Sequence, residues 1–340
     1  MKAYTTKGVI DLKKIMNAPE NIVNEMLEGL TTVHKELVYR VPGTSVIAKV
    51  AQSAGQVGLV SGGGSGHEPA HAGFVGDGML AAAACGPVFT SPSPDQVLEA
   101  IKVADSGAGV LLIIKNYSGD IMNFDMAKDL AEMEGIAVDF VIVDDDIAVE
   151  DSTYTQGRRG VAGTILVHKI LGAAARSGLK LAELKAIGDA LIPNIKTLGL
   201  AINPATVPEV GKPGFELGAD EIEFGIGIHG EPGYRREKLK TSAEMATELV
   251  DTLERSISLE QQSIAVLING LGATPLMEQY VFANDALRLL EAKGASIVFK
   301  KLGDYMTAID MAGVSLTVLT LTDSRYLDWL NEPVTTIAWN

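Results

Sequence analysis

Four short stretches of the chain combine glycine with polar side chains that can do chemistry. They are VSGGGSGHEP (60–69), IIKNYSGD (113–120), RRGVAGT (158–164) and FGIGIHGEPG (224–233). Each adjoins an apolar run, which is typical of loops that carry function on a rigid α/β frame. Histidine is the usual general base near neutral pH, and a neutral imidazole can also attack a carbonyl carbon. His67 and His229 are therefore candidates for both kinds of chemistry, with Lys115 and Asp120 as polar neighbours.

Each of these residues also has a structural interpretation that the local sequence leaves open. His67 and His229 could be turn histidines satisfied by backbone groups, and Lys115 and Asp120 a solvated pair in a loop. The run of aspartates at 144–146 follows an apolar segment, and a charged turn after a strand is favoured there over a bound cation.

Three familiar motifs are absent or unsuited to their usual role. HEPAH, from His67 to His71, has the spacing of HExxH, but Pro69 fits a first helical turn and leaves His67 outside any helix, so we expect no metal. The third glycine of a dinucleotide fingerprint is replaced by His67. No GxxxxGK[ST] is present, so the sequence shows no phosphate cradle of its own for ATP.

Apolar periodicity predicts alternating strands and helices. The expected strands are 44–50, 56–60, 109–114, 136–143, 221–228, 264–268, 296–300 and 314–321, and the expected helices are 19–30, 94–104, 123–134, 163–176, 181–192, 242–255 and 275–293. The glycine run is expected to be a strand-to-helix turn with His67 at the helix entrance, and Ser93 with Gln96 a capping box. This alternation predicts an α/β fold of two domains, the first with a largely parallel sheet flanked by helices and the second with a smaller mixed sheet. We expect an N-terminal domain at 1–190 with the glycine-rich loop, and a C-terminal domain at 191–340 carrying His229.

Composition narrows the class of protein. The 340 residues carry a formal net charge of −15, which argues against nucleic-acid or anionic-membrane binding. Cys85 is the only cysteine, so an internal disulfide and a thiolate metal cluster are both excluded. The N-terminus lacks the apolar core of a signal peptide, and no run reaches the ~20 apolar residues of a membrane span. We therefore expect a cytoplasmic location.

Taken together and in this order, the stretches resemble the substrate-binding part of the dihydroxyacetone kinase family. The resemblance extends over nearly the whole chain, in SGGGSGHEPAH, GVLLIIKNYSGDIMNFDMA, RRGVAGTILVHK, FGIGIHGEPG, NGLGATP and DYMTAIDMAG. It implies two α/β domains in a homodimer, with the substrate held between the domains.

The resemblance also implies roles for individual residues. His229 would bind the carbonyl carbon of dihydroxyacetone covalently as a hemiaminal, His67 would act as base on the terminal hydroxyl, and Asp120 would orient that hydroxyl. The remaining residues that would contact the sugar are Gly64, Ser65, Gly66 and Lys115.

The phosphoryl donor would come from elsewhere. The resemblance implies that ADP or ATP with magnesium is held by a nucleotide-binding partner subunit, fed by a phosphoryl-carrier protein, while this chain binds no cofactor. Because the chain ends at Asn340, soon after the second domain, we expect the stand-alone subunit of a phosphotransferase. Two alternatives stay open: a dihydroxyacetone-sensing coactivator of a transcription regulator, and a kinase subunit for another short ketose such as erythrulose. A sensor would need His229 but no base, so His67 and Asp120 favour the enzyme.

Overall fold

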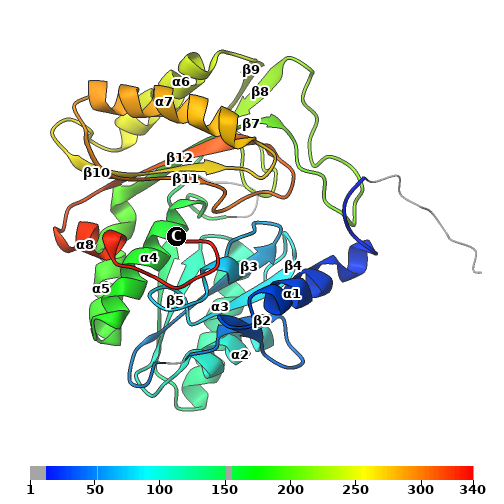
Figure 1. The fold of residues 1–340 in the computed structure, drawn as a ribbon, viewed down its shortest axis with the longest axis vertical. Helices are drawn as coiled ribbons and strands as arrows, with labels where there is room; N and C mark the ends of the chain where they lie inside the picture. The colour runs from blue at the N-terminus through cyan, green and yellow to red at the C-terminus, as the bar shows by residue number, and fades with distance from the viewer. Residues whose placement is uncertain (1–12, 52, 151–154, 340) are drawn as a thin grey trace, which may run out of the picture.

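The computed structural model describes residues 13–51, 53–150 and 155–339. Within them the chain forms two six-stranded sheets, which lie one above the other in Figure 1. The lower sheet has the strand order β1-β2-β4-β3-β5-β6, and the upper sheet has the order β11-β10-β12-β7-β8-β9. Helices flank both sheets, so the predicted pair of α/β domains is confirmed.

Parallel pairing dominates the first sheet. Its strands are β1 (Val38–Arg40), β2 (Val46–Lys49), β3 (Gly58–Ser65), β4 (Ala82–Val88), β5 (Val110–Lys115) and β6 (Val138–Val143). β3 pairs in parallel with β4 and β5, and β5 pairs in parallel with β6, while β1 and β2 are antiparallel at one edge. β5 is buried along its whole length, which explains its unbroken apolar run. The carboxyl ends of β3 and β5 therefore lie at the same edge of the sheet, where open α/β sheets bind ligands.

The second sheet is mixed, as predicted, but mostly antiparallel. Its strands are β7 (Ile195–Asn203), β8 (Glu221–Phe224), β9 (Arg235–Lys238), β10 (Ser263–Gly270), β11 (Ser296–Gly303) and β12 (Ala312–Thr320). Only β10 and β11 pair in parallel, because helix α7 connects them as a crossover. The other neighbouring strands pair antiparallel.

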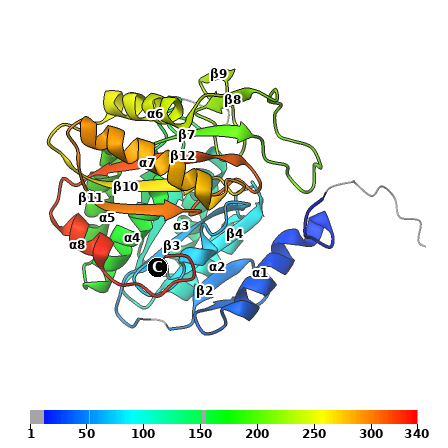
Figure 2. The ribbon, with the colours of Figure 1, turned by 45° about the horizontal axis from the view of Figure 1, so that its top comes forward.

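The helices form layers around and between the sheets. They are α1 (Ile22–Val33), α2 (Pro94–Ala104), α3 (Ser118–Met133), α4 (Gly163–Arg176), α5 (Leu181–Leu191), α6 (Ser242–Ser256), α7 (Leu276–Ala292) and α8 (Arg325–Asn331). Figure 2 shows α6 and α7 on the outer face of the second sheet. α4 contacts strands of both sheets and is buried from 163 to 175, and its sequence there is apolar or glycine except for Thr164, His168 and Lys169. This helix is the central layer between the two sheets.

The last segment of the chain returns to the connection between β3 and β4. Thr335 pairs with Asp77 through two backbone hydrogen bonds of 3.0 and 3.1 Å, and Trp339 stacks on Phe299 of β11 with ring centroids 6.2 Å apart. This segment therefore joins the two layers. The domain limits 1–190 and 191–340 remain a prediction, and the expected limit falls at the end of α5.

Several predicted elements differ from the observed ones. The expected strand at 221–228 ends at Phe224, because Gly225 has a φ of +77° and turns the chain out of the sheet. The strands β1, β4, β7 and β9 were not predicted; β4 is rich in alanine, so its local propensity for a strand is low and pairing with β3 decides its conformation. The expected capping box at Ser93 does not form, because the Gln96 side chain instead accepts hydrogen bonds from Ser45.

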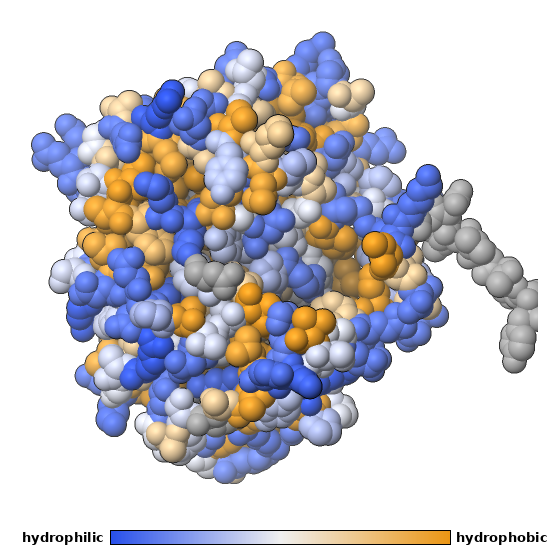
Figure 3. All heavy atoms as spheres, viewed as in Figure 1, coloured by the Kyte–Doolittle hydropathy of each residue, from blue (hydrophilic) through white to orange (hydrophobic). Residues whose placement is uncertain are grey.

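The surface mixes polar and apolar residues on the face that Figure 3 shows, with apolar residues gathered over α7. Exposed apolar side chains of this helix include Leu276, Met277 and Val281. None of the helices in the described parts of the chain is long and apolar enough to cross a membrane.

Candidate functional site

The glycine run lies inside strand β3, so the expected strand-to-helix turn is wrong. Close packing explains the glycines. A Cβ on Gly62 would lie 2.4 Å from the Ala84 carbonyl oxygen of the neighbouring strand, and a Cβ on Gly64 would lie 2.5 Å from the backbone nitrogen of Thr90. The chain after the strand forms only the short 3₁₀ helix η2 (Ala72–Phe74), so His67 does not sit at the start of an α-helix.

Gly63 provides the space that a buried lysine occupies. A Cβ at this position would lie 2.3 Å from Nζ of Lys115, and the φ of Gly63 is +151°. Replacing Gly63 by alanine should therefore displace the lysine and lower the free energy of unfolding by about 1–3 kcal/mol. Urea unfolding measures the change. Gly29→Ala in α1 is the matched control, because its Cβ would meet nothing within 4 Å and should stabilise the helix by up to about 1 kcal/mol. Equal stability of the two variants would contradict the prediction.

Lys115 and Asp120 form a buried ion pair, so the solvated loop that local sequence left open is excluded. Nζ of Lys115 donates to Oδ2 of Asp120 at 3.2 Å and to the carbonyl oxygen of Gly62 at 3.1 Å. Ser91 donates its hydroxyl proton to the other carboxylate oxygen, Oδ1, at 2.5 Å. Asp120 lies in the first turn of α3, which begins at Ser118 and not at 123 as expected. The helix N-terminus also favours the negative charge of this carboxylate.

His67 is completely buried, and one of its ring nitrogens has no partner. Nδ1 lies 2.7 Å from the carbonyl oxygen of Thr307, which can only accept, so the ring proton is on Nδ1. Nε2 has no hydrogen-bond partner among the described residues and is left as an acceptor. Burial, with smaller effects from His229 and Lys115, holds the pKa of His67 well below its usual range. The imidazole is therefore neutral at physiological pH, as a proton acceptor must be.

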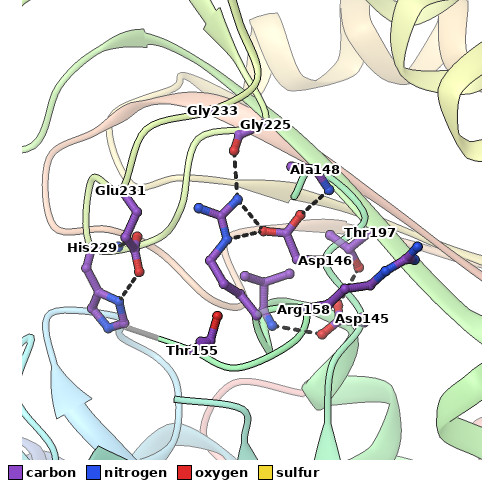
Figure 4. A network of polar contacts seen from close by, with 12 residues as sticks. Asp145, Asp146, Ala148, Thr155, Arg158, Thr197, Gly225, His229, Glu231 and Gly233 are labelled. Carbon is purple, nitrogen blue, oxygen red and sulfur yellow. Dashed lines mark hydrogen bonds and ion pairs between the residues drawn. The ribbon is translucent and has the colours of Figure 1, made fainter. Parts of the chain in front are cut away.

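His229 comes from the other half of the chain, in the loop after β8, and its ring meets that of His67. The two ring centroids are 4.8 Å apart, at an interplanar angle of 73°. Phe89 and Tyr117 also contact the His229 ring edge to face, with centroids at 5.2 and 4.7 Å. The carboxylate of Glu231 accepts from Nδ1 of His229 at 2.9 Å, as Figure 4 shows. Three aromatic rings and one carboxylate thus hold this imidazole in place.

A cavity of about 560 Å³ opens onto these side chains. Its lining residues are Gly64, Phe89, Thr90, Ser91, Tyr117, Ser118, Gly119, Asp120, Asn123 and His229. The predicted residues Gly64, Asp120 and His229 therefore line one cavity, while His67 and Lys115 are buried behind its wall. Ser65 and Gly66 are not part of the lining. The Ser65 hydroxyl donates to the Gly86 carbonyl oxygen at 2.7 Å, and the Gly66 N–H donates to the Glu68 carboxylate.

Sequence reasoning missed part of this wall. Phe89, Ser91 and Tyr117 line the cavity but were not among the predicted site residues. Tyr117 lies within the IIKNYSGD stretch, so its position beside Lys115 was an available signal. Phe89 and Ser91 lie in an unremarkable loop after β4 and could not be identified without the pairing of β3 with β4.

The three aspartates directly follow strand β6, and two of them, Asp145 and Asp146, are buried. Asp145 accepts from the backbone N–H groups of Val161 and Gly163, each at 2.8 Å, and Asp146 is bound by the guanidinium of Arg159. These carboxylates therefore hold the RRGVAGT stretch against the sheet.

The second histidine of the HEPAH motif turns away from the first. Nδ1 of His71 lies 3.0 Å from Nε2 of His168, in the middle of α4, and both rings are buried. Burial, with smaller effects from Lys115 and other histidines, holds the pKa of His71 well below its usual range; burial and Lys115 lower that of His168 to about 3. His67 and His71 therefore have separate environments.

These buried histidines should make the fold sensitive to acid. In the unfolded chain they titrate near pH 6.5, whereas the folded protein keeps them neutral, so the unfolded state binds more protons below that pH. The free energy of unfolding should be at its maximum above about pH 6.5. At about pH 5 it should be lower by about 2 kcal/mol per buried histidine. Urea unfolding at both pH values measures the fall. His34→Ala, outside the cavity, is the control, and this variant should show the same fall in the free energy of unfolding between the two pH values. A flat profile would contradict neutral burial.

Comparison with known proteins finds a family model that matches most of this chain. The Dak1 domain matches residues 28–338. The PTS-dependent dihydroxyacetone kinase, dihydroxyacetone-binding subunit DhaK, of Lactococcus lactis is 61% identical over 96% of this chain and 99% of its own length. The corresponding PEP-dependent subunit of Escherichia coli is 41% identical over 97% and 99%.

A relative with a different stated role is also similar. The DhaKLM operon coactivator DhaQ of Lactococcus lactis is 45% identical over 96% of this chain and its entire length. Among solved structures, the dihydroxyacetone kinase of C. freundii in complex with AMP-PNP and Mg²⁺ has a TM-score of 0.89 and 34% identity, over 96% of this chain and 61% of the longer kinase. Fold similarity alone therefore does not separate a kinase subunit from a coactivator.

Proposed function

Since the chain belongs to the dihydroxyacetone kinase family through its Dak1 domain, we propose that it is the dihydroxyacetone-binding subunit of such a kinase. The observation that carries the proposal is the arrangement of His229, Asp120 and Gly64 around one cavity, with a neutral His67 ring against His229. A nucleophile and a carboxylate thus face one cavity, and a base packs directly against the nucleophile, although the three residues come from distant parts of the chain.

His229 would hold the substrate covalently. Nε2 of the neutral ring donates its lone pair to the carbonyl carbon, and the π electron pair of the C=O bond moves to the oxygen. The oxygen gains a proton and the ring gives up its Nδ1 proton, so the addition is neutral overall and yields a hemiaminal. The bond requires a carbonyl group, so glycerol is excluded in spite of its similar hydroxyls.

Covalent attachment compensates for weak binding by ordinary contacts. Dihydroxyacetone has about six heavy atoms and no charge, and even the best small ligands reach only about 1.5 kcal/mol per heavy atom. Its hydroxyls exchange hydrogen bonds with water for hydrogen bonds with protein, at a small net gain. A reversible carbon–nitrogen bond to His229 therefore supplies affinity that this ligand otherwise lacks.

The terminal hydroxyl would then be phosphorylated. Asp120, fixed by Ser91 and Lys115, orients the hydroxyl, and His67 accepts its proton through the unpartnered Nε2. Phosphoryl transfer depends on this alignment of the nucleophile and on charge stabilisation at the phosphate. The product is dihydroxyacetone phosphate.

The nucleotide and its magnesium would be held by a partner subunit. The lining of the cavity contributes one carboxylate, that of Asp120, and this group is already bound by Ser91 and Lys115. Divalent cations take several oxygen ligands, so these residues do not fit a metal site. The partner would present the phosphoryl group at the cavity mouth and be recharged by a phosphoryl-carrier protein. A homodimer of this chain is also proposed, and light scattering of the purified protein tests it.

Reconstitution tests the proposal. The chain is mixed with dihydroxyacetone and a purified nucleotide-binding subunit, and sugar phosphate is followed with either magnesium-ATP or a phosphoenolpyruvate-fed carrier as donor. Product formation under one donor would establish the kinase subunit and identify that donor. Tight binding of dihydroxyacetone without turnover under both donors would favour the coactivator role, for which the 45% identical relative is the supporting observation.

The cavity size supports a second substrate. A volume of about 560 Å³ exceeds what a three-carbon ketose fills, so a four-carbon ketose such as erythrulose could also be accommodated. Comparing kcat/KM for the two ketoses in the same reconstituted assay decides between them.

A further inference from the structure

The carboxylate of Glu231 holds His229 through both of its oxygens. Oε1 accepts from Nδ1 of the ring at 2.9 Å, and Oε2 accepts from the backbone N–H of His229 at 3.0 Å. An ionised carboxylate can only accept, so in the neutral imidazole the ring proton is on Nδ1 and the lone pair is on Nε2. Glu231 thereby selects the ring nitrogen that is free to attack.

Behind Glu231 lies a completely buried arginine. Arg159 donates from Nε and Nη2 to Oδ2 of Asp146, each at 2.8 Å, and from Nη2 to the Gly225 carbonyl oxygen at 2.8 Å. Figure 4 shows Asp146 and Gly225, the two acceptors, beside the loop that carries His229 and Glu231. The remaining nitrogen, Nη1, has no hydrogen-bond partner among the described residues.

That unpartnered nitrogen lies near Glu231. A Cβ on Gly227 would be 2.7 Å from Nη1 of Arg159 and 2.0 Å from Oε2 of Glu231, so both atoms pack against the same glycine. Only glycine leaves room for the cation and the carboxylate to approach each other there.

The charges are consistent with this arrangement. Burial raises the pKa of Glu231, but its hydrogen bond and electrostatic interaction with the His229 ring, together with the charge of Arg159, outweigh burial and lower the pKa to about 2. Burial raises the pKa of Asp146 to about 6 in spite of Arg159, so this carboxylate is also ionised at neutral pH. Tyr117 and His67 also face the His229 ring.

We propose that Arg159, anchored by Asp146, is a positioning residue that acts through Glu231 to keep the proton of His229 on Nδ1 and Nε2 free for attack. The inference rests on the proposed covalent role of His229. On attack the ring carries a positive charge until its Nδ1 proton leaves, and the negative charge of Glu231 stabilises that cation. Arg159 and Asp146 follow the first sheet whereas His229 and Glu231 follow β8, so the nucleophile is activated only when the two layers are packed together.

The first experiment determines the tautomer of the His229 ring in the absence of substrate. Nitrogen-15 NMR of the full chain, labelled at histidine and assigned with His229→Ala, should show the His229 proton on Nδ1. In Glu231→Gln and in Arg159→Met, the share of the Nε2-protonated form should rise. A wild-type ring protonated on Nε2, or an unchanged spectrum in Arg159→Met, would overturn the inference.

The second experiment is a double-mutant cycle on hemiaminal formation. The carbonyl signal of carbon-13-labelled dihydroxyacetone is followed over time with the chain in excess. Glu231→Gln and Arg159→Met should each slow its loss by about 10–100-fold, the usual effect of removing a group that orients a histidine. The double variant should be no slower than Glu231→Gln alone, because Arg159 acts through Glu231. Fully additive losses would show a merely structural arginine and contradict the proposal.

Two further variants guard against misfolding. Arg159→Met leaves Asp146 buried without its partner, so Arg159→Met with Asp146→Asn is made as well and should show the same slowing. Glu223→Gln is the matched control, since Glu223 is a buried carboxylate that binds Arg236 and the Gly233 N–H but not His229, and it should change the rate less than about 2-fold. If the wild-type chain forms no adduct at all, the proposed function fails, while the tautomer experiment still tests the network.

Discussion

Replacing His229 by alanine should abolish covalent retention of dihydroxyacetone and lower turnover in the reconstituted kinase by at least about 10³-fold. The imidazole is a nitrogen nucleophile in the cavity lining, and the carboxylate of Glu231 orients it. Without it the ketose is held only by ordinary contacts, which are weak for so small and uncharged a ligand. Carbon-13 NMR of labelled dihydroxyacetone measures the loss directly, because the wild-type chain in excess should convert the carbonyl signal to that of a tetrahedral carbon.

His34→Ala is the control for this experiment. His34 lies at the end of α1, away from the cavity, and its replacement should leave both the adduct and turnover unchanged. An adduct that persists in His229→Ala would assign the nucleophile to another residue. A wild-type chain that leaves the carbonyl signal in place would refute the hemiaminal.

Replacing His67 by asparagine should lower turnover by about 10²–10⁴-fold, the usual contribution of a general base. The bare Nε2 of this buried, neutral ring is the acceptor that the proposed mechanism uses. Because burial holds the pKa of His67 well below 6.5, protonation of this base should not reduce wild-type turnover between about pH 8 and pH 6.5. Steady-state turnover with saturating partner subunit measures both effects.

Asp120→Asn, assayed in parallel, distinguishes the role of Asp120 from that of His67. Asparagine keeps the shape of Asp120 and can still accept from Ser91, so a loss of orientation alone should be smaller than the loss in His67→Asn. If His67→Asn loses less than about 10-fold in turnover while Asp120→Asn loses far more, the carboxylate of Asp120 is the base instead. Circular dichroism and urea unfolding verify that the buried substitutions leave the fold intact.

Local sequence patterns were sufficient to predict the helices and strands in which apolar residues recur regularly. α6 was predicted at 242–255 and runs from Ser242 to Ser256, and α2 was predicted at its observed bounds. The unbroken apolar run before Lys115 also predicted a buried strand. In these elements burial on one or both faces follows directly from the order of apolar residues, so the pattern and the structure agree.

The glycine run shows where local pattern misleads. Consecutive glycines indicate a turn when only conformational freedom is considered. In the folded chain Gly62, Gly63 and Gly64 remain in a strand, because they pair with β4. They must be glycine because the carbonyl of Ala84, the amine of Lys115 and the loop at Thr90 leave no space for a Cβ. Those neighbours are distant in the sequence, so the reason for the glycines could not be read locally.

By itself, the sequence determined the family, the α/β fold class and the residues His67, Asp120 and His229 as candidates, because motif composition and apolar periodicity are local properties. Only the tertiary structure decided which charged groups are buried and what they contact. The pairing of Lys115 with Asp120 and of Arg159 with Asp146 depends on how strand ends and loops meet. A buried charge persists only where a partner is supplied. Nη1 of Arg159, which follows the first sheet, packs against the same glycine as Oε2 of Glu231, so packing of the two layers decides which charges surround His229.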